Sequence, residues 1–291
     1  MERYRDIIDD WQAFQEACES PALSAVRRNR LKACDDFESR LHREFDDVEQ
    51  SAWNQEVYRL RDEKRPGKSM MHWRGEYYVQ EESAAIPVNA LDPQPGDAVL
   101  DMCAAPGGKS TQMAAKMDNR GKVIANDASA KRMKSLHANV YRTGAACVAA
   151  TNYDGRHLPE DGSYDRVLVD APCSGEGDQA RRDFEPADRD EIESLSRLQK
   201  QLVEKAAVLV EDRGAVVYST CTIAPEENEE VVEHALENTG LKLEQVELDG
   251  PHQRGVDGFR GEEYGGEMEK TLRVYPHHME SGVIFVARFS K

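Results

Sequence analysis

Short apolar runs alternate with amphipathic stretches from about Gln94 onward. The runs are rich in Val, Ile, Leu and Ala, and in the stretches between them apolar residues recur every three or four positions. Buried strands that alternate with helices are typical of a doubly wound α/β domain, in which helices cover both faces of a parallel sheet. The expected strands are Ala98–Met102, Lys122–Asp127, Ala146–Asn152, Arg166–Asp170 and Ala215–Cys221, and the expected helices include Ser129–Thr143, Glu191–Glu211 and Pro225–Glu237.

The pattern differs at both ends of the chain. Leu272–Pro276 and Val283–Phe289 are expected to pair as a terminal antiparallel hairpin, and the glycine- and charge-rich Asp249–Gly266 predicts a long loop. Apolar residues at helical spacing predict one amphipathic helix within residues 1–20 that packs on the body of the protein; they are Tyr4, Ile7, Ile8, Trp11, Phe14 and Ala17.

Residues 21–80 combine a basic run, an amphipathic stretch around Leu41 and a Pro66-Gly67 loop, which together predict a small α+β module. We therefore expect two domains. The first, residues 1–83, contains the N-terminal helix and this module, and the second, residues 84–291, is the α/β domain.

No apolar run approaches the roughly 18 residues that a membrane helix needs, and the first twenty residues lack the apolar core of a signal peptide. The six cysteines show no short-range CxxC pairing, so we expect reduced thiols and a cytoplasmic protein.

The net charge of −17 at first argues against a polyanionic partner, because nucleic-acid-binding proteins usually carry a basic patch. The acidic excess is, however, spread along the chain rather than gathered in a tail. Such a surface suits concentrated salt, which screens charges within about 3 Å at 1 M. The charge thus predicts a halophilic protein. In such a protein, local clusters of arginine indicate binding partners better than the net charge does.

A turn of small residues follows the first expected strand, whose end is Asp101. In open α/β sheets ligands bind outside the carboxyl ends of the strands, and small residues let the backbone approach them. A phosphate-binding loop of the GxxxxGK[ST] type would need a glycine where this chain has a cysteine, so an adenosyl ligand is favoured. The turn is Cys103-Ala104-Ala105-Pro106-Gly107-Gly108-Lys109.

Acidic residues stand at or just past four of the expected strand ends. Asp127, about twenty residues after the glycines, is placed to accept both ribose hydroxyls of an adenosine, and Asp154 to meet an adenine amino group. Each aspartate alone could instead be a helix N-cap or a turn former. With Asp101 and Asp170 they favour a site for S-adenosylmethionine.

Two cysteines, Cys173 and Cys221, follow two of these strand ends beside polar or helix-breaking neighbours. A single buried cysteine is usually a small apolar filler, and we interpret Cys34 and Cys147 in this way. A thiol is also a nucleophile and a weak acid, which suits chemistry on a carbon that must first be activated by covalent addition. No metal site is expected.

Five segments of the chain resemble the Nol/Nop/Sun family of RNA cytosine-C5 methyltransferases over roughly residues 70–290. The resemblance implies a Rossmann-like methyltransferase sheet preceded by a small RNA-recognition-like domain, which here lacks an obvious aromatic RNP signature. The segments are Tyr77-Tyr-Val-Gln-Glu-Glu-Ser83, Asp101-Met-Cys-Ala-Ala-Pro-Gly-Gly-Lys-Ser110, Asp170-Ala-Pro-Cys-Ser-Gly175, Tyr218-Ser-Thr-Cys-Thr222 with Pro225-Glu-Glu-Asn-Glu229, and Arg273-Val-Tyr-Pro-His277.

The same resemblance implies roles for individual residues. Cys221 would add to C6 of the cytosine, Asp170 would stabilise charge or a proton at N3, and Cys173 would serve release of the product. Lys109 could orient Asp170. The cofactor site would comprise Cys103 to Lys109, Asp127, Arg132, Asp154 and Asp170, although Arg132 could equally be a surface residue of its helix.

A cytosine must be unpaired or flipped out to meet a thiol, so the enzyme needs a grip on the flanking backbone. The compact chain, with no further RNA-binding domain expected, is similar to archaeal members that act on tRNA, and tRNA is favoured over rRNA. We expect a monomer. A non-catalytic RNA-binding assembly factor and a small-molecule methylase are the alternatives. The candidate RNA contacts are Arg27, Arg28, Arg30, Lys32, Arg59, Arg61, Lys64, Arg65, Lys68, Arg181 and Arg182.

Overall fold

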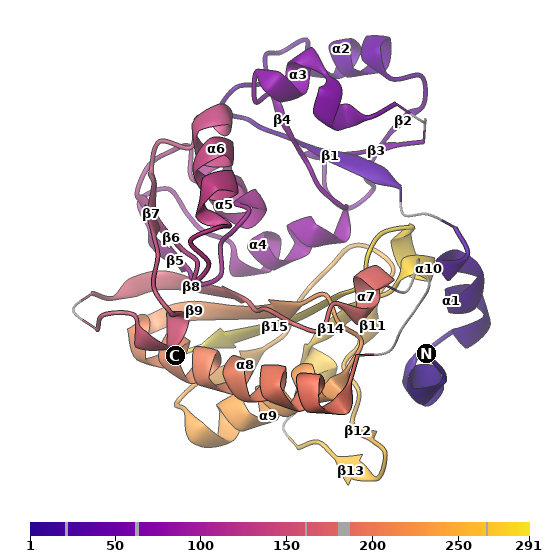
Figure 1. The fold of residues 1–291 in the computed structure, drawn as a ribbon, viewed down its shortest axis with the longest axis vertical. Helices are drawn as coiled ribbons and strands as arrows, with labels where there is room; N and C mark the ends of the chain where they lie inside the picture. The colour runs from indigo at the N-terminus through magenta and orange to yellow at the C-terminus, as the bar shows by residue number, and fades with distance from the viewer. Residues whose placement is uncertain (21–22, 62–63, 161, 180–186, 266) are drawn as a thin grey trace.

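The computed structural model describes residues 1–291 except 21–22, 62–63, 161, 180–186 and 266. A large central sheet carries helices on both faces, and a smaller sheet lies beside one layer of these helices (Figure 1). Among the described residues, no helix has the length and apolar character needed to cross a membrane.

One half of the large sheet is parallel, with the order β9-β8-β5-β6-β7. All five expected strands are present, and the three expected helices correspond to α6 (Met133–Thr143), α8 (Arg189–Leu209) and α9 (Glu229–Asn238). The bounds are β5 Ala98–Asp101, β6 Lys122–Asn126, β7 Val148–Thr151, β8 Tyr164–Asp170 and β9 Val210–Thr220.

The other half of the sheet is antiparallel. β15 (Ile284–Ser290) runs antiparallel to β9 and also pairs with β14 (Leu272–Val274), so the predicted terminal hairpin is confirmed. The sheet as a whole is therefore mixed rather than purely parallel. Short strands complete this half or lie in the expected long loop; they are β10 Lys242–Glu244, β11 Gln253–Arg254, β12 Gly258–Phe259 and β13 Glu262–Glu263.

Helices cover the two faces of the large sheet in separate layers. α4 (Ile86–Leu91), α5 (Gly108–Lys116) and α6 (Met133–Thr143) form one layer, and α8 (Arg189–Leu209) and α9 (Glu229–Asn238) form the other (Figure 1). Because successive strand residues point to opposite faces, a strand covered on both sides has to be apolar throughout.

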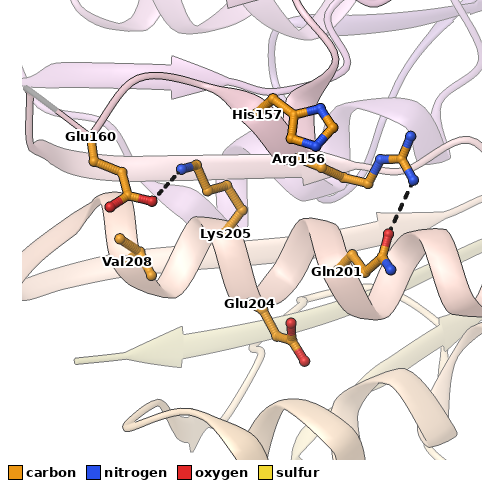
Figure 2. A pocket seen from close by; sticks show the side chains of 7 residues that line it. All are labelled: Arg156, His157, Glu160, Gln201, Glu204, Lys205 and Val208. Carbon is orange, nitrogen blue, oxygen red and sulfur yellow. Dashed lines mark hydrogen bonds and ion pairs between the residues drawn. The ribbon is translucent and has the colours of Figure 1, made fainter.

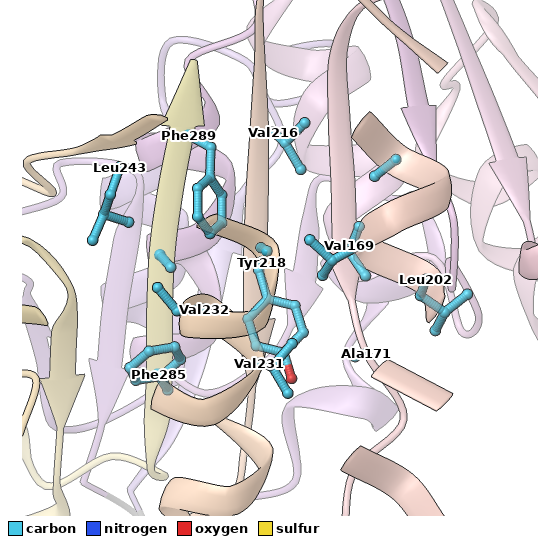
Figure 3. Packing of buried hydrophobic residues seen from close by; sticks show 14 of the residues in the cluster. Val169, Ala171, Leu202, Val216, Tyr218, Val231, Val232, Leu243, Phe285 and Phe289 are labelled. Carbon is cyan, nitrogen blue, oxygen red and sulfur yellow. The ribbon is translucent and has the colours of Figure 1, made fainter. Parts of the chain in front are cut away.

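The core of the large domain follows this alternation along each strand. In β8, Val167 and Val169 pack with the α8 and α9 side, whereas Leu168 between them packs with the α4 side. Figure 3 shows Val169, Tyr218 of β9 and Phe285 of β15 in the cluster beneath α8 and α9. Packing of this cluster holds the ends of β8 and β9 next to each other.

The N-terminal sheet has the antiparallel order β2-β3-β1-β4, with β1 and β3 in the centre. The chain order β-α-β-β-α-β is that of the ferredoxin-like motif, which agrees with the expected α+β module. The bounds are β1 Ser24–Arg28, α2 Phe37–Glu44, β2 Val48–Gln50, β3 Val57–Leu60, α3 Met70–Trp73 and β4 Tyr77–Val79.

The two faces of this N-terminal sheet have different partners. Val26 and Tyr58 pack with Phe37 and Leu41 of α2. On the opposite face, Arg27 donates hydrogen bonds to Gly108 O and Thr111 Oγ1 of α5. The face on which RNA-recognition domains stack bases is thus covered by α5 of the large domain, which gives a physical reason for the missing aromatic signature.

The prediction of a single helix in residues 1–20 is wrong. A 3-10 helix, η1 (Glu2–Ile7), is followed by extended backbone at Ile8, and α1 (Trp11–Cys18) then starts from Asp10, whose side chain accepts the N–H of Ala13 at 3.0 Å. Both pieces pack on the large domain as expected, α1 against α10 (Pro276–Met279). The remaining elements are α7 Glu176–Gln179, η2 Pro66–Lys68, η3 Ser83–Ala85, η4 Gly155–His157, η5 Pro225–Glu227 and η6 Met268–Lys270.

Candidate active site

The glycine-rich turn between β5 and α5 forms a tight wedge at the carboxyl end of the sheet. Ala104 N donates to Asn126 O at 2.7 Å and Gly107 N donates to Ala104 O at 2.7 Å. Gly107 has a φ of +104°, and a Cβ at this position would lie 2.9 Å from Leu136 Cδ1. Only glycine therefore fits at this point, immediately before α5 begins.

A cavity of about 240 Å³ lies beside this turn, and Tyr78, Gln80, Asp101, Lys109 and Asp170 contribute to its wall. Burial raises the pKa of Asp101 to about 7. One carboxyl oxygen of Asp101 accepts Ser110 Oγ at 2.6 Å, and the other is buried with, of the described residues, only the backbone N–H of Cys103 near the carboxylate, which opposes the rise in pKa. A buried acceptor in this state suits a ligand that carries an ammonium group, such as the methionine part of S-adenosylmethionine.

Asp127 and Arg132 support the turn from the next strand. Asp127 accepts Ala105 N at 3.1 Å and Ser129 N at 2.9 Å, and Arg132 Nη1 lies 3.3 Å from the same carboxylate. Arg132 also donates to Ala105 O. Asp127 therefore both caps the following turn and lies against the predicted cofactor loop, so its contact with a ribose stays a prediction.

Asp154, the predicted adenine contact, is the N-cap of η4. Its carboxylate accepts Arg156 N at 3.0 Å and forms an ion pair with the Arg156 guanidinium at 2.5 Å. Arg156 in turn reaches Gln201 of α8 at the separate surface hollow shown in Figure 2. Asp154 is not among the described residues that line the cavities beside the turn. Its contacts agree with the alternative of a cap, and its cofactor role stays a prediction.

A second cavity of about 540 Å³ holds both predicted catalytic thiols. Cys173 Sγ lies 3.2 Å from Cys221 Sγ, because β8 and β9 are parallel neighbours and each cysteine follows its strand end. Cys103, Lys109 and Asp170 line this cavity as well as the first one. The two cavities therefore meet at these residues and at Ala84, which also lines both, so that a methyl donor in one cavity can face a base in the other.

Lys109 and Asp170 form the charged centre of the site. Lys109 Nζ lies 2.8 Å from Asp170 Oδ2, and Ser219 Oγ donates to Asp170 Oδ1 at 2.8 Å. Burial alone would lower the pKa of Lys109, but the adjacent carboxylate outweighs it and holds the pKa above its usual value. Lys109 is therefore a cation at neutral pH that contacts one oxygen of Asp170 while Ser219 contacts the other; that Lys109 orients Asp170 during the reaction stays a prediction.

Cys103 differs from the other two thiols of the site. Burial, with the nearby carboxylates of Asp101 and Asp170, raises the pKa of the Cys103 thiol. Its sulfur stays protonated at neutral pH and is a poor nucleophile. Cys103 therefore forms part of the wall of the site, and covalent chemistry at Cys173 and Cys221 stays a prediction.

Comparison with known proteins agrees with this geometry. Residues 88–290 match the family model of the 16S rRNA methyltransferase RsmB/F, and residues 1–82 match the N-terminal domain of 16S rRNA methyltransferase RsmF. The chain belongs to the RsmB/F family of RNA methyltransferases.

The relatives to which this chain is similar are named for different RNA substrates. The chain is 36% identical to the tRNA (cytosine(49)-C(5))-methyltransferase of Pyrococcus abyssi, over 100% of this chain and 95% of that protein. It is 37% identical to the human 28S rRNA (cytosine(4447)-C(5))-methyltransferase over 96% of this chain, but only 35% of that longer protein. A methyltransferase homologue from Pyrococcus horikoshii has the same fold, with a TM-score of 0.88, 32% identity and coverage of 100% and 93% of the two chains.

Membership of the RsmB/F family confirms several predictions. The Rossmann-like fold with a separate N-terminal domain, the activity of an RNA cytosine-C5 methyltransferase and the use of S-adenosylmethionine are confirmed. Sequence reasoning gave no individual role to several residues of the site. Tyr78 and Gln80 line the cavity beside the glycine-rich turn, and Glu227 and Asn228 support the cysteine turns. Their signal was membership of the family-like segments Tyr77–Ser83 and Pro225–Glu229, whereas Asp101 was also marked by its place at a strand end.

The structure separates the candidate RNA contacts of this RsmB/F chain into groups. Arg59, Arg61 and Lys64 are held in ion pairs with Glu49, Glu280 and Asp46 respectively, among others. Arg27 is only 4% exposed, and burial lowers its pKa to about 10. Arg27 is therefore wrong as an RNA contact, because its guanidinium is used inside the protein. Arg30 and Lys32 are exposed, whereas Arg181 and Arg182 lie outside the described residues.

Asp9, His277 and His278 bring three potential metal ligands together. However, His278 Nδ1 accepts the N–H of Tyr275 at 3.2 Å, so the neutral ring carries its proton on Nε2 and donates it to Asp9 at 3.0 Å. A metal ligand needs a free electron pair at that nitrogen and usually donates from the other one. The arrangement therefore fits a hydrogen-bonded clasp of the N-terminal segment better than a metal site.

Proposed function

We propose that this chain methylates C5 of a cytosine in tRNA through a covalent bond between Cys221 and C6 of the base. The observation that carries the proposal is the pair of thiol sulfurs 3.2 Å apart, beside the Lys109–Asp170 ion pair. All four side chains line one cavity, and that cavity meets the one beside the glycine-rich turn.

Addition to C6 comes first, because C5 of cytosine is a weak nucleophile until C6 is saturated. The Cys221 thiolate forms the S–C6 bond, and the electrons of the C5=C6 double bond move toward C5. The proton lost by the Cys221 thiol is taken up at N3 of the base, and the carboxylate of Asp170 stabilises it there by accepting a hydrogen bond from N3–H. Because Lys109 and Ser219 hold both oxygens of Asp170, the carboxylate needs no reorientation during this step.

Bound S-adenosylmethionine supplies the electrophilic methyl group that C5 takes up. Within this chain, the Cys103–Lys109 turn and Asp101 would hold the cofactor, with Asp127 and Arg132 behind the turn. Cys173 then accepts the remaining proton from C5, the electron pair of that C–H bond restores C5=C6, and the S–C6 bond to Cys221 breaks. Two thiols are needed because one is still bound to the base when the proton has to leave.

The preference for tRNA rests on relatives. The tRNA (cytosine(49)-C(5))-methyltransferase of Pyrococcus abyssi is similar to this chain over 95% of its own length, whereas the similarity covers 35% of the human 28S rRNA enzyme. A ribosomal RNA substrate is the second candidate, because the family model is named for 16S rRNA enzymes. Bisulfite sequencing of total RNA from a strain lacking the gene distinguishes them. Loss of a single tRNA methylcytosine is expected, and loss of an rRNA methylcytosine alone would contradict the preference.

A further inference from the structure

Glu227 and Asn228 are consecutive residues, both fully buried, at the junction of η5 and α9. Neither is among the described residues that line the two cavities of the active site. Their side chains nevertheless hold the two turns that carry the catalytic thiols, one residue for each turn.

Glu227 holds the turn of Cys173 directly through Ser174, which follows the cysteine, and indirectly through Gln199, which contacts Pro172 before it. Its carboxylate accepts the N–H of Ser174 at 3.0 Å and also the hydroxyl of Ser174. Gln199 donates to Glu227 at 2.8 Å and to Pro172 O at 2.9 Å, so it links the carboxylate to the residue before Cys173 as well. Burial raises the pKa of Glu227, and the donors from Ser174 and Gln199 oppose this rise.

Asn228 holds the turn of Cys221 in the same manner. Its Oδ1 accepts the hydroxyl of Thr220 at 2.5 Å, and its Nδ2 donates to Thr222 O at 3.0 Å. These contacts bracket Cys221 on both sides. An amide is suited to this place because it offers both an acceptor and a donor, which neither a carboxylate nor a hydrocarbon side chain does.

The two turns are also joined directly. Ser174 Oγ lies 2.8 Å from Thr222 Oγ1, and the two thiols lie 3.2 Å apart. Because Glu227 and Asn228 are consecutive and buried, the two cysteine turns are held by neighbouring positions of one segment of the chain. Either turn could still shift alone if its own contact were lost.

We propose that Glu227 and Asn228 are separate positioning residues for the two thiols, Asn228 for addition by Cys221 and Glu227 for release by Cys173. The proposal rests on the covalent mechanism given above. Neither residue touches the base; each acts through the turn that it holds. A displacement of about 1 Å in a reacting group can lower a rate about 100-fold, so the loss of either contact is expected to be visible in one step of the reaction.

Asn228→Ala is expected to slow formation of the covalent RNA adduct and methylation together, by about 10- to 100-fold. Glu227→Ala is expected to leave the first methyl transfer within about threefold of the native rate and to slow release, so that a Cys221-dependent adduct accumulates. A purely structural role would weaken both steps in both variants. Slowed addition in Asn228→Ala and slowed release in Glu227→Ala would therefore distinguish a positioning role of each residue from a general contribution to stability.

The experiment is a single-turnover reaction of the full chain with tRNA and labelled S-adenosylmethionine, followed by a denaturing gel. Thermal melts report on folding, and Glu237→Ala, an exposed change on the same helix, is the matched control. Should Glu227→Ala melt early, Ser174→Ala removes the hydroxyl that contacts both Glu227 and Thr222 and is expected to show the same accumulation. Thr222→Val, which removes the contact between the two turns but keeps the contact between Ser174 and Glu227, is its control and is expected to release at the native rate. Asn228→Asp keeps the acceptor for Thr220 but loses the donor to Thr222, and an intermediate rate is expected.

Equal loss of addition in both variants, or native release in Glu227→Ala and Ser174→Ala, would overturn the proposal. Cys173→Ala on the same gel separates this outcome from failure of the mechanism itself. If Cys173→Ala accumulates an adduct and the Glu227 and Ser174 variants do not, the positioning role is wrong and the covalent mechanism stands. If Cys173→Ala shows no adduct, the proposed division of labour between the thiols fails first.

Discussion

At the scale of single residues, Asp170 is the group whose setting is most fully defined by the structure. Both of its oxygens are engaged, by Lys109 and by Ser219. Asp170→Asn is expected to lower methyl transfer by about 100-fold or more, because the amide cannot hold the proton at N3. Ser219→Ala removes one hydrogen bond of about 1 kcal/mol and is expected to cost only about fivefold. Equal rates for both variants in single-turnover assays would contradict this assignment.

Asp101 gives a prediction about stability and pH. Burial raises its pKa from 3.8 to about 7, so the folded protein binds more protons than the unfolded chain between these values. The free energy of unfolding therefore falls as the pH rises from about 4 to about 7, by at most about 4 kcal/mol. Asp101→Asn is expected to lack this loss. Urea unfolding measured from pH 4.5 to 8 should show that the free energy of unfolding of Asp101→Asn rises relative to that of the native chain as the pH increases. A difference in free energy between the two proteins that does not change with pH would refute the prediction.

The residues that sequence reasoning found are those whose position follows from strand order alone. Cys173 and Cys221 were expected together because the ends of parallel strands share one edge of the sheet. The contacts of Glu227, Asn228 and Gln199 depend on how α8 and η5 dock on that edge, which no local pattern encodes. The same holds for the buried second oxygen of Asp101.

At the scale of elements, the least expected feature is the contact between the N-terminal sheet and α5. Arg27 donates to Gly108 O, Thr111 and Gln112 from the sheet face that an RNA-recognition domain would leave open. A run of arginines in the sequence predicted RNA contacts without distinguishing which side of the strand each one occupies. Alternation along β1 decides this, and it places Arg27 inward.

Arg27 and Arg30 therefore form a matched pair for mutation. Arg27→Ala is expected to lower the melting temperature, because several buried hydrogen bonds are lost at once, while the salt dependence of RNA binding stays unchanged. Arg30→Ala, at an exposed position, is expected to leave the melting temperature unchanged and to reduce the slope of log K against log salt by about 1 if it meets a phosphate. The reverse pattern would contradict the assignment of Arg27 to the domain contact.

Elements were predicted well where packing on both faces forces a continuous apolar run, as in β5, β6 and β8. The prediction was wrong at the N-terminus, where a continuous helical period hides the break at Ile8 and the new start at Asp10. Periodicity reports which side of a segment is buried, but a short 3-10 turn followed by a cap buries the same residues as one helix would.

At the scale of the whole molecule, the net charge of −17 makes the halophilic hypothesis testable. If the acidic surface is adapted to salt, the melting temperature and the methylation rate should both rise as potassium chloride is increased into the molar range, because screening removes self-repulsion. Thermal melts across a potassium chloride series measure this. A melting temperature that is highest in dilute buffer would contradict the hypothesis, which stays a prediction, as does the monomeric state.

The central claim concerns the whole site, in which one thiol adds to the base and the other releases it. The most direct measurement is a denaturing gel of Cys173→Ala, Cys221→Ala and the double variant, each incubated with tRNA and S-adenosylmethionine. If Cys221 adds to the base and Cys173 releases it, Cys173→Ala forms a denaturant-resistant RNA complex that disappears in the double variant, and Cys221→Ala shows neither adduct nor methylation. An adduct that forms in Cys221→Ala instead would show the roles reversed, and full methylation by both single variants would show that the covalent mechanism is wrong.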